Sequence, residues 1–465
     1  MNYRGKKCAV LGMARSGLAA ARLLLREGAF PSILESRDDE LSQRKALLLR
    51  SENITVFLGK EVDEDSTIYD LAILSPGIET TAPLVKKVTQ HGTPLIGELE
   101  LAYSCCHRPI IAITGTNGKT TTTELTTKAL QGAGLRAIAC GNIGLPFSEA
   151  ILQNNQVDVF VVEASSFQLE TIQRFRPRVA LLLNLSPNHL DRYSSVEEYY
   201  AAKFNIFKNL SAEPSQSSSG GDVAVIPASL YRDELGIKVP YITFSTKSDD
   251  ADFYFHDGLF FYQGKSFLSI KDTLLRGLHN AENLMAAFAA GRALGAPLER
   301  MVQAVKDYRA PAHRCEWVAQ ENDIIWMNDS KSTTLDALEK AVLSIEASRP
   351  IILIAGGKNK GFSFESLLPL LQKRLKAAIL LGELKFNIAA QWHSLECHLV
   401  ESLQEAVARA AALATRGDTI LLSPGTSSYD MFENYEERGD CFKNAVHTLL
   451  KSSKTSHPSI IYSPC

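Results

Sequence analysis

The sequence predicts an α/β fold of three domains. Three observations predict it. Apolar runs alternate with stretches of helical periodicity, many runs are apolar at nearly every position, and turns bearing Gly or Ser follow them. The expected domains span 1–97, 98–311 and 312–465.

Composition excludes several classes of protein. The chain has 465 residues, 45% hydrophobic and 22% charged, and its net charge of -3 argues against nucleic acid as a partner. Its eight cysteines contain no C-x-x-C pair, so we expect reduced thiols. No apolar stretch reaches the ~20 residues of a membrane span. We therefore expect a cytoplasmic protein.

The first domain opens with the apolar run CAVLG, the turn GMARSG and the helical pattern LAAARLLLREG. The turn is similar to a dinucleotide fingerprint, but Ala14 replaces its second glycine and Ser16 breaks the pattern. Two further strands end at polar residues. SILESR carries Glu35 and Arg37, and DLAILSPGI carries Ser75 and Gly77. We interpret the domain as a reader of a nucleotide diphosphate, with redox cofactor binding as the weaker alternative.

The second domain contains RPIIAITGTNGKTTTTE, an apolar strand, a Gly-rich loop and a helical pattern. Backbone N–H groups of such a loop and the positive end of the helix dipole bind phosphate. Lys119 can reach the outer phosphates, and the Thr120 hydroxyl can ligate Mg²⁺. Ile113 stands where the usual motif has its first glycine, so the loop is a shorter variant. The alternative is a strand-to-helix turn with an incidental lysine.

Other candidate site residues of this domain lie at or after the ends of its predicted strands and helices. Glu163 ends the apolar run VDVFVV and is a candidate metal ligand, the alternative being a solvated strand end. His189, in NLSPNHLDRY, follows another strand, but alone it suits a structural loop network with Asp191 and Arg192. Lys203, in EEYYAAKF, has the spacing of an ordinary helix-surface lysine.

The third domain follows YRAPAHR, where we expect a hinge near Pro311. In IIWMNDSKSTT a strand leads into an acid, a cation and hydroxyls, which suit a ribose and a phosphate but equally a helix N-cap. IAGGKNKG and LLSPGTSSYDMFENYEERG end later strands, and lysine beside glycine there can bind a carboxylate. The last fifteen residues, KSSKTSHPSIIYSPC, are expected to be disordered or loosely docked.

As a set, GTNGKTTT, VVEASSFQLE, NHLDRY with YYAAK, HNAEN, APAHR, NDSKST and LLSPGTSSYDMFENYEERG occur in the order of the Mur ligases. The chain resembles this family to about residue 450, and SSFQLE, NDSK and the LSP stretch point to its D-glutamate-adding member. The resemblance implies an N-terminal Rossmann-like domain, a central P-loop domain of the mononucleotide-binding ATPase type, and a C-terminal Rossmann-like domain.

The resemblance also implies the reaction. ATP would phosphorylate the terminal carboxylate of UDP-N-acetylmuramoyl-L-alanine, and the amine of D-glutamate would attack the acyl phosphate, in cytoplasmic peptidoglycan precursor synthesis. Two Mg²⁺ ions would offset the negative charge. A carbamate formed from CO₂ on Lys203 would serve the metal site. The expected protein is a monomer.

Residue roles follow from the same resemblance. The catalytic residues would be Lys119, Glu163, His189 and Lys203, and the metal ligands Thr120, Glu163, His189 and carbamylated Lys203. ATP would contact Gly115, Thr116, Asn117, Gly118, Lys119, Thr120, Thr121, Asn280, Asn283, Arg314, Asp329 and Lys331. The UDP substrate would contact Arg15, Ser16, Glu35, Arg37, Ser75, Gly77, Asn142, Ser165 and Gln168. D-glutamate would contact Thr333, Lys360, Ser428 and Tyr435.

The sequence departs from the family pattern at Ala14 and Arg15, at Thr334, at Tyr429, and at Pro187 and Asn188. Three other functions remain as alternatives. They are a relative that adds another amino acid or extends folate, a nucleotide-sugar sensor without catalysis, and a motor ATPase. A folate enzyme would not need a UDP-reading first domain, and a sensor would not need the metal and carbamate residues.

Overall fold

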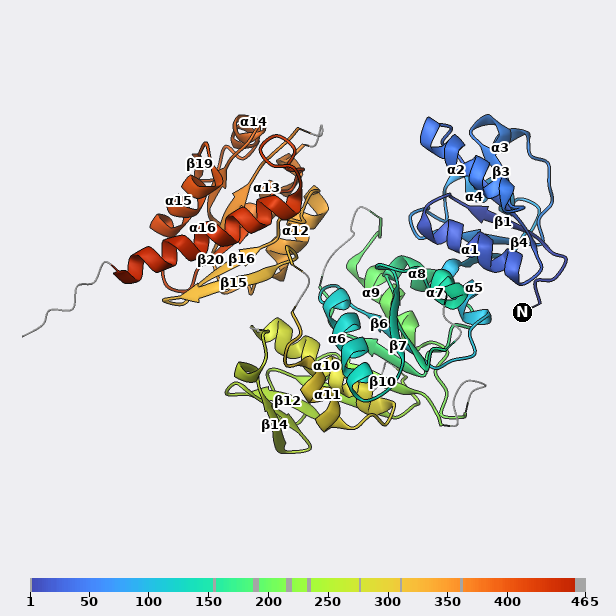
Figure 1. The fold of residues 1–465 in the computed structure, drawn as a ribbon, viewed down its shortest axis with the longest axis horizontal. Helices are drawn as coiled ribbons and strands as arrows, with labels where there is room; N and C mark the ends of the chain where they lie inside the picture. The colour runs from blue at the N-terminus through green and yellow to red at the C-terminus, as the bar shows by residue number, and fades with distance from the viewer. Residues whose placement is uncertain are drawn as a thin grey trace, which may run out of the picture. The chain divides into compact units, whose positions relative to one another are not determined.

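The computed structural model describes residues 2–153, 156–186, 192–214, 220–231, 236–275, 277–309, 312–359 and 363–455 (Figure 1). The chain divides into two compact units, Met1–Tyr308 and Arg309–Cys465. The first unit contains two sheets and the second contains one. The predicted α/β class is confirmed, while the domain limits 1–97, 98–311 and 312–465 stay predictions.

The N-terminal sheet has five parallel strands in the order β3-β2-β1-β4-β5. The strands are β1 (Lys7–Leu11), β2 (Phe30–Glu35), β3 (Thr55–Leu58), β4 (Leu71–Leu74) and β5 (Leu95–Gly97). The helices are α1 (Arg15–Arg26), α2 (Glu40–Ser51), α3 (Lys60–Glu64), α4 (Pro83–Thr89) and α5 (Glu98–Ser104). Helix α1 lies close to β1 because Gly17 has no side chain. A Cβ at Gly17 would lie 2.1 Å from the carbonyl oxygen of Gly12.

The central sheet has nine strands in the order β14-β13-β12-β11-β10-β9-β6-β8-β7. Its strands are β6 (Ile110–Thr114), β7 (Ala137–Gly141), β8 (Val159–Glu163), β9 (Val179–Leu182), β10 (Val223–Pro227), β11 (Tyr241–Ser245), β12 (Phe253–His256), β13 (Leu259–Tyr262) and β14 (Lys265–Ser269). Its helices are α6 (Lys119–Gly132), α7 (Phe147–Gln153), α8 (Ser166–Glu170), α9 (Val196–Phe204), α10 (Leu278–Ala293) and α11 (Leu298–Val305). Strand β6 lies between β8 and β9. The chain adds β7 and β8 on one side of β6 and then β9 and β10 on the other side, so the order of the strands reverses beside β6. Ligands bind at such switch points in open α/β sheets.

Strands β12, β13 and β14 pair antiparallel and extend this sheet, a feature that our sequence analysis missed. Turns at Asp257–Gly258 and Gln263–Gly264 join them, and all four residues have positive φ angles between 47° and 80°. An Asp-Gly pair between apolar runs is a strong signal for a two-residue hairpin turn. The signal was therefore present in the sequence.

The second unit has a six-stranded sheet in the order β15-β16-β20-β17-β18-β19, with β15 antiparallel to β16 and the others parallel. Its strands are β15 (Glu316–Glu321), β16 (Ile324–Asn328), β17 (Ile351–Ala355), β18 (Leu375–Leu380), β19 (Cys397–Leu399) and β20 (Thr419–Leu422). Its helices are α12 (Leu335–Ser344), α13 (Leu368–Arg374), α14 (Lys385–Gln391), α15 (Leu403–Leu413) and α16 (Tyr435–Thr455). Helix α16 reaches Thr455, so the first five residues of the expected loose tail are helical, and 456–465 lie outside the described residues.

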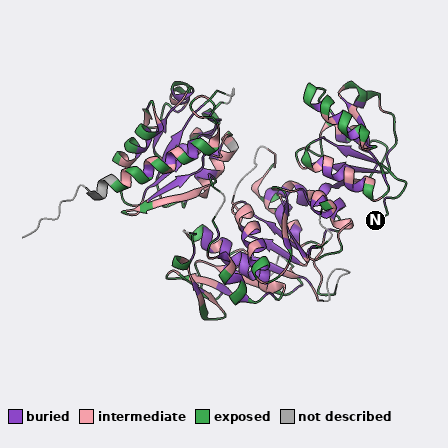
Figure 2. Ribbon diagram, viewed as in Figure 1, coloured by how far each residue is buried: buried purple, intermediate pink, exposed green. Residues whose placement is uncertain are grey.

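The buried strands lie between helical layers, with exposed residues on the outer helix faces (Figure 2). In the first unit one apolar cluster joins the two sheets through side chains such as Leu24 of α1, Leu101 of α5 and Phe147 of α7. In the second unit separate apolar clusters cover the two faces of the sheet. Within the described part of the chain, the seven cysteines are free and no helix is long and apolar enough to cross a membrane.

Two buried glutamates of α5 bind backbone groups of the central part of the unit. Glu100 is fully buried, and its carboxylate accepts hydrogen bonds from the N–H groups of Gln173, Arg174 and Phe175 at 2.8–2.9 Å. Glu98 accepts one from the N–H of Ser148 at 2.6 Å. Buried carboxyl groups require such partners, so α5 is held to the first turn of α7 and to the segment between α8 and β9.

Candidate functional site

The loop between β6 and α6 has the geometry of a phosphate-binding loop. Gly118 is the N-cap of α6 and adopts a left-handed conformation with φ 79°. A Cβ at Gly118 would lie 2.3 Å from Asn283 Oδ1, and a Cβ at Gly115 would lie 2.8 Å from Leu183 Cβ. Neighbouring side chains thus occupy the space that larger residues would need at both glycines.

The loop is held from the end of β9 by Asn184, which our sequence analysis did not single out. Its Oδ1 accepts hydrogen bonds from the N–H groups of Thr116 at 3.1 Å and Asn117 at 2.9 Å, and its Nδ2 donates to the Asn117 carbonyl at 3.1 Å. The Thr116 hydroxyl in turn donates to the Ser186 carbonyl at 3.2 Å. Asn184 follows an apolar strand, and polar residues at such strand ends often face a ligand, so this position is the signal that could have identified Asn184.

Two lysines point their ammonium groups at the carbonyls of this loop. Lys119 Nζ donates to the carbonyls of Gly115 and Thr116, both at 2.9 Å. Lys203 Nζ donates to the Gly115 carbonyl at 2.8 Å and lies 4.5 Å from the centre of the Tyr199 ring. Lys203 is only 1% exposed, so the interpretation as a helix-surface lysine is wrong.

Glu163 is 1% exposed at the end of β8, so it is not a solvated strand end. Its carboxylate accepts hydrogen bonds from the Thr120 hydroxyl at 3.0 Å and from Asn142 Nδ2 at 2.9 Å. Both donors are neutral, so a cation bound here would compensate the buried negative charge. The hard oxygen ligands of this group suit Mg²⁺.

No group of three or more His, Cys, Asp or Glu side chains is placed to hold a metal ion within the described ranges. His189, the remaining predicted protein ligand, lies outside those residues. Carbamylation of Lys203 would add a second carboxylate close to the loop. The predicted set of metal ligands therefore depends on His189 and on a carbamate at Lys203, in addition to the described side chains.

Helix α10 brings the predicted adenine-side residues to the phosphate-binding loop. Asn283 Oδ1 accepts a hydrogen bond from the Thr122 hydroxyl at 3.1 Å, and Asn283 Nδ2 donates to Asn280 Oδ1 at 3.4 Å. Thr121 lies half-buried in the first turn of α6. Asn280 and Asn283 are both buried, so this contact is part of the packing between α6 and α10.

Ser165 and Gln168 form a capping box at the start of α8. The backbone N–H of Gln168 donates to Ser165 Oγ at 3.3 Å, and the side-chain Oε1 of Gln168 accepts from the backbone N–H of Ser165 at 3.0 Å. This arrangement orients both side chains at the carboxyl edge of the sheet. Their predicted contact with substrate remains a prediction.

The N-terminal sheet places part of the predicted UDP site at the carboxyl ends of β1, β2 and β4. Glu35 accepts hydrogen bonds from the N–H groups of Met13 at 3.0 Å and Arg37 at 3.1 Å. Burial alone would raise the pKa of Glu35, but these hydrogen bonds and the Arg37 guanidinium lower it below its ordinary value. Ser75 is 5% exposed, and its Oγ lies near Gly12 with no hydrogen-bond partner among the described residues.

The other three predicted UDP contacts lie at the surface or in open space. Arg15 is exposed and Ser16 is half-buried, both in the first turn of α1. A Cβ at Gly77 would meet no atom within 4 Å. The space beside Gly77 is therefore open to a ligand.

In the second unit, Asp329 and Lys331 follow β16. Asp329 Oδ2 accepts a hydrogen bond from the Ser423 hydroxyl at 2.9 Å, and Oδ1 accepts one from the N–H of Cys315 at 3.1 Å. Burial raises the pKa of Asp329 to about 7, although these bonds and nearby Arg314 oppose the rise. Lys331 Nζ lies 3.7 Å from the centre of the Tyr435 ring, so two predicted site residues are in contact.

Sequence reasoning missed Arg438, a guanidinium that is 2% exposed on α16. Its Nε donates to Ser330 Oγ at 2.9 Å, its Nη2 donates to the Ser330 carbonyl at 2.9 Å, and both Nη atoms donate to the Thr426 carbonyl at 3.3 Å. Burial lowers the pKa of Arg438 to about 10. Arg438 thus joins the loop after β16 to the loop after β20, which carries Ser428.

The remaining residues predicted to contact D-glutamate differ in burial, and one of them lies outside the described residues. Ser428 is buried, and its carbonyl accepts hydrogen bonds from the N–H groups of Met431 at 3.1 Å and Phe432 at 2.9 Å. Thr333 is half-buried in the turn before α12. Lys360, together with the expected hinge residue Pro311, lies outside the described residues.

Family models match three consecutive parts of the chain. They describe a Mur ligase MurD-like N-terminal domain at residues 6–97, a Mur ligase middle domain at 113–291, and a Mur ligase glutamate ligase domain at 313–425. The chain belongs to the Mur ligase family.

Individual relatives agree with this assignment. UDP-N-acetylmuramoylalanine–D-glutamate ligase of Caldicellulosiruptor saccharolyticus is 38% identical over 97% of this chain and 100% of its own length. The protein of the same name from Koribacter versatilis is 36% identical over 98% of this chain and 100% of its own. MurF ligase from Thermotoga maritima in complex with ADP has a TM-score of 0.52 at 16% identity, covering 96% of each chain. A murein peptide ligase from Psychrobacter arcticus has a TM-score of 0.51 at 17% identity, covering 98% of this chain and 100% of its own. The two structures support the fold alone.

We predict that Gly118→Ala weakens ATP binding at least about tenfold, because the added Cβ meets Asn283 in addition to straining a left-handed backbone. Gly134→Ala is the matched control. Gly134 also has positive φ, 94°, but a Cβ there meets nothing within 4 Å. Calorimetric titration with ATP measures both variants. Equal affinities for the two variants would contradict a role for the Gly118–Asn283 contact.

Asp329 predicts a pH dependence of stability. Its pKa is about 7 in the folded chain against an ordinary value of 3.8, so between these values the folded state keeps a proton that the unfolded state loses. The free energy of unfolding therefore falls as pH rises through this window, by up to about 1.4 kcal/mol per pH unit, and levels off above pH 7. Asp329→Asn should flatten this slope in urea unfolding measured from pH 4 to 8, whereas Asp249→Asn on the surface should not. Parallel slopes for wild type and Asp329→Asn would refute the assignment.

Proposed function

We propose that this chain is an ATP-dependent ligase that joins D-glutamate to the alanine carboxylate of UDP-N-acetylmuramoyl-L-alanine in peptidoglycan precursor synthesis. The observation that carries the proposal concerns two buried charged residues. Glu163 contacts Thr120, directly after the Gly115–Lys119 loop, and Lys203 contacts the Gly115 carbonyl of that loop. Neither a sensor nor a simple structural turn needs both of these costly buried charges. The names of the 36–38% identical relatives support this choice of substrates.

In the first step an oxygen of the alanine carboxylate attacks the γ-phosphorus of ATP. The bond between this phosphorus and the bridging oxygen breaks, ADP leaves, and an acyl phosphate forms. The Thr116 and Asn117 N–H groups donate to Asn184. The other N–H groups of the loop would hold the phosphates together with Lys119, while the N-terminal end of α6 supplies the positive end of its dipole. Catalysis of this kind consists mainly of positioning and charge compensation.

The oxygen ligands around Glu163 fit Mg²⁺, and two such ions would offset the charge of the phosphates and of the reacting carboxylate. Thr120 and Glu163 would hold the first ion, with Asn142 orienting the carboxylate. His189 would bind the second. Hydrogen bonding by the neighbours of a ligand keeps it in position for its metal.

We propose that Lys203 is carbamylated. The ammonium group first loses one proton, the neutral Nζ then attacks CO₂ to form a C–N bond, and a second proton leaves to solvent, so that a cation and CO₂ give a carbamate anion and two protons. Lys203 Nζ lies 2.8 Å from the Gly115 carbonyl oxygen, so the carbamate would form beside the phosphate-binding loop. The product places an anion where the site needs to hold cations.

In the second step the amine of D-glutamate attacks the acyl carbon. A tetrahedral intermediate forms and collapses with release of phosphate, leaving the new amide bond. Ser428, Thr333, Tyr435 and Lys360 would hold D-glutamate, and Asp329 with Lys331 would contact the ribose and phosphates of ATP. Arg438 supports this arrangement by joining the two loops that carry these residues.

The first sheet would bind the UDP end of the substrate. Glu35 and Arg37 would bind the nucleoside. Ser75 Oγ has no hydrogen-bond partner among the described residues, and with the open space at Gly77 it fits a diphosphate or ribose oxygen. We further propose that the protein works in the cytoplasm as a monomer. Gel filtration with light scattering tests the monomer.

We predict that Lys203→Arg lowers turnover by at least about a hundredfold, because arginine keeps the positive charge and cannot form the carbamate. Wild type equilibrated with ¹³C-bicarbonate should show a carbamate carbon signal by NMR, and the variant should lack it. Lys208→Arg, on the exposed turn after α9, is the control and should leave both signal and turnover unchanged. A full signal in Lys203→Arg would place the carbamate elsewhere.

The function itself is tested by phosphate release with ATP, Mg²⁺ and UDP-N-acetylmuramoyl-L-alanine. We expect release that requires both this substrate and D-glutamate, with L-glutamate and L-lysine inactive. Release with another amino acid would keep the mechanism and change the acceptor. Folded protein that binds ATP but releases no phosphate with any acceptor would contradict the ligase and favour a sensor.

A further inference from the structure

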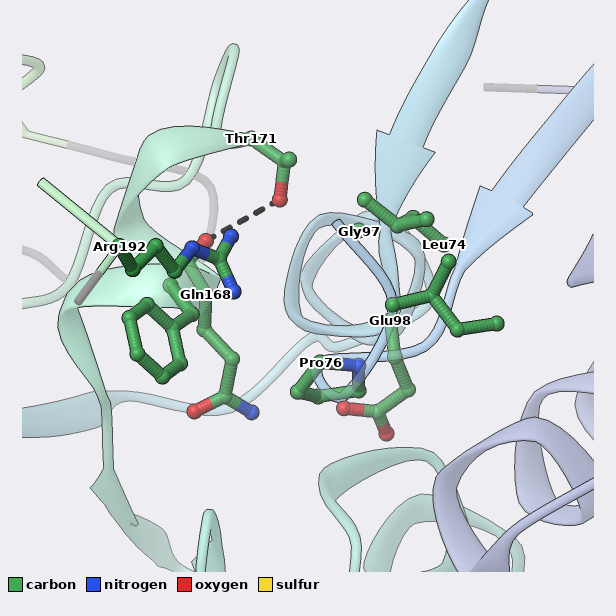
Figure 3. Close-up of a pocket in the computed structure, with 9 residues that line it drawn as sticks. Leu74, Pro76, Gly97, Glu98, Gln168, Thr171 and Arg192 are labelled. Atoms are coloured by element: carbon green, nitrogen blue, oxygen red, sulfur yellow. Dashed lines mark hydrogen bonds between the residues drawn. The ribbon is translucent and has the colours of Figure 1, made fainter. Parts of the chain in front are cut away.

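A small cavity lies in the first unit beside helix α8 (Figure 3). Its volume is about 10 Å³, and its walls include Gln168 and Arg192. Thr171 also lines it, and the Thr171 hydroxyl donates a hydrogen bond to the Gln168 carbonyl at 3.2 Å. The cavity is too small for a substrate and borders a residue already assigned to the UDP substrate. It therefore adds no separate ligand site.

Asp430 lies where three strand-end loops of the second unit meet. They are the loop after β17, which contains Gly357, the loop after β18, which contains Gly382, and the loop after β20, which contains Asp430. A Cβ at Gly382 would lie 2.3 Å from Asp430 Oδ2 and 2.9 Å from Gly357 Cα. The absence of a side chain at Gly382 therefore lets the three loops approach one another closely.

The Asp430 carboxylate connects the loop after β20 to the loop after β18. Its Oδ2 accepts a hydrogen bond from the N–H of Glu383 at 2.9 Å. The loop after β18 is bound in turn to the loop after β17, because the N–H of Leu384 donates to the Gly357 carbonyl at 3.1 Å. A hydrogen bond with a charged acceptor is stronger than one between neutral groups, so this contact is a firm attachment for the loop after β20.

The loop after β20 also carries Ser428, one of the residues predicted to contact D-glutamate. The Ser428 carbonyl accepts hydrogen bonds from the N–H groups of Met431 at 3.1 Å and Phe432 at 2.9 Å. Asp430 therefore lies inside a closed turn that begins at Ser428. None of the roles proposed above uses Asp430.

We propose that Asp430 is a positioning residue for D-glutamate. Its hydrogen bond to the Glu383 N–H holds the Ser428–Phe432 turn against the loop after β18 and so fixes Ser428 in place for the amino acid. Asp430 acts through this turn and does not touch D-glutamate itself. The role rests on the proposed function, because the contact of Ser428 with D-glutamate is itself a proposal.

The donor of this hydrogen bond can be removed by one substitution. A type I turn starts at Gly382, since the N–H of Lys385 donates to the Gly382 carbonyl at 3.3 Å and Leu384 has φ -86° and ψ -1°. Glu383 is the second residue of this turn, where proline is favoured. Glu383→Pro thus suits the turn and lacks the N–H. Glu383→Ala, which loses the same side chain but keeps the N–H, is the matched control.

Kinetics with D-glutamate as the varied substrate test the role. In Glu383→Pro the KM for D-glutamate should rise by roughly tenfold, because the hydrogen bond to a charged group is lost. The KM for ATP should stay unchanged, and Glu383→Ala should keep both values. An active Glu383→Pro with the wild-type KM for D-glutamate would overturn the proposal.

Substitution of the acceptor gives a second test, which remains available if Glu383→Pro does not fold. The charge of Asp430 also opposes the fall in the pKa of buried Arg438, so charge and hydrogen bond must be separated. Asp430→Ala removes both and should raise the KM for D-glutamate roughly tenfold. Asp430→Asn keeps an acceptor oxygen without the charge and should restore the KM. An equal rise in both variants would assign the effect to charge and overturn the hydrogen-bond role.

Hydrogen exchange checks the contact without turnover. The Glu383 amide should exchange roughly tenfold faster in Asp430→Ala than in wild type or Asp430→Asn, and equal rates in all three would contradict the contact. The phosphate-release assay separates the two proposals. A wild type that releases no phosphate contradicts the ligase, whereas an active wild type whose KM for D-glutamate is unchanged in Glu383→Pro and Asp430→Ala contradicts only the role of Asp430.

Discussion

Packing around the backbone of the Gly115–Lys119 loop is the constraint on which the candidate site depends. Asn184 after β9 binds two N–H groups of the loop, Asn283 of α10 occupies the space beside Gly118, and Lys203 of α9 binds the Gly115 carbonyl. The loop therefore does not curl around phosphate by its own preference alone. Three elements distant in sequence determine its shape before a ligand arrives, and such preorganisation reduces the ordering cost of binding.

The buried charged side chains differ in how completely their hydrogen bonds are satisfied. Glu100 is satisfied by three N–H groups, and Arg438 by carbonyl and hydroxyl oxygens, so both hold the structure together. Glu163 and Glu98 differ, because one has only neutral donors and the other has an oxygen without a described partner. Buried groups whose partners are incomplete are the places where a cation, a modification or a water is expected.

The site residues divide between two compact units. The first carries the phosphate-binding loop and the predicted UDP contacts, and the second carries Asp329, Lys331, Ser428 and Tyr435. Hydrogen bonds within each unit hold residues of its own share, such as those of Asn184 in the first and Arg438 in the second. In the second unit Arg438 of α16 connects the loop after β16 with the loop after β20.

Strand runs and the loop motif could be predicted from the sequence alone, because periodicity and glycine placement are local properties. The family resemblance added the reaction and its residues. The local pattern predicted a surface position for Lys203, which is buried, and gave no indication of the roles of Asn184 and Arg438. Burial and partnership of a side chain depend on elements far away in the chain, and only the tertiary structure brings α9, β9 and α10 to the loop after β6.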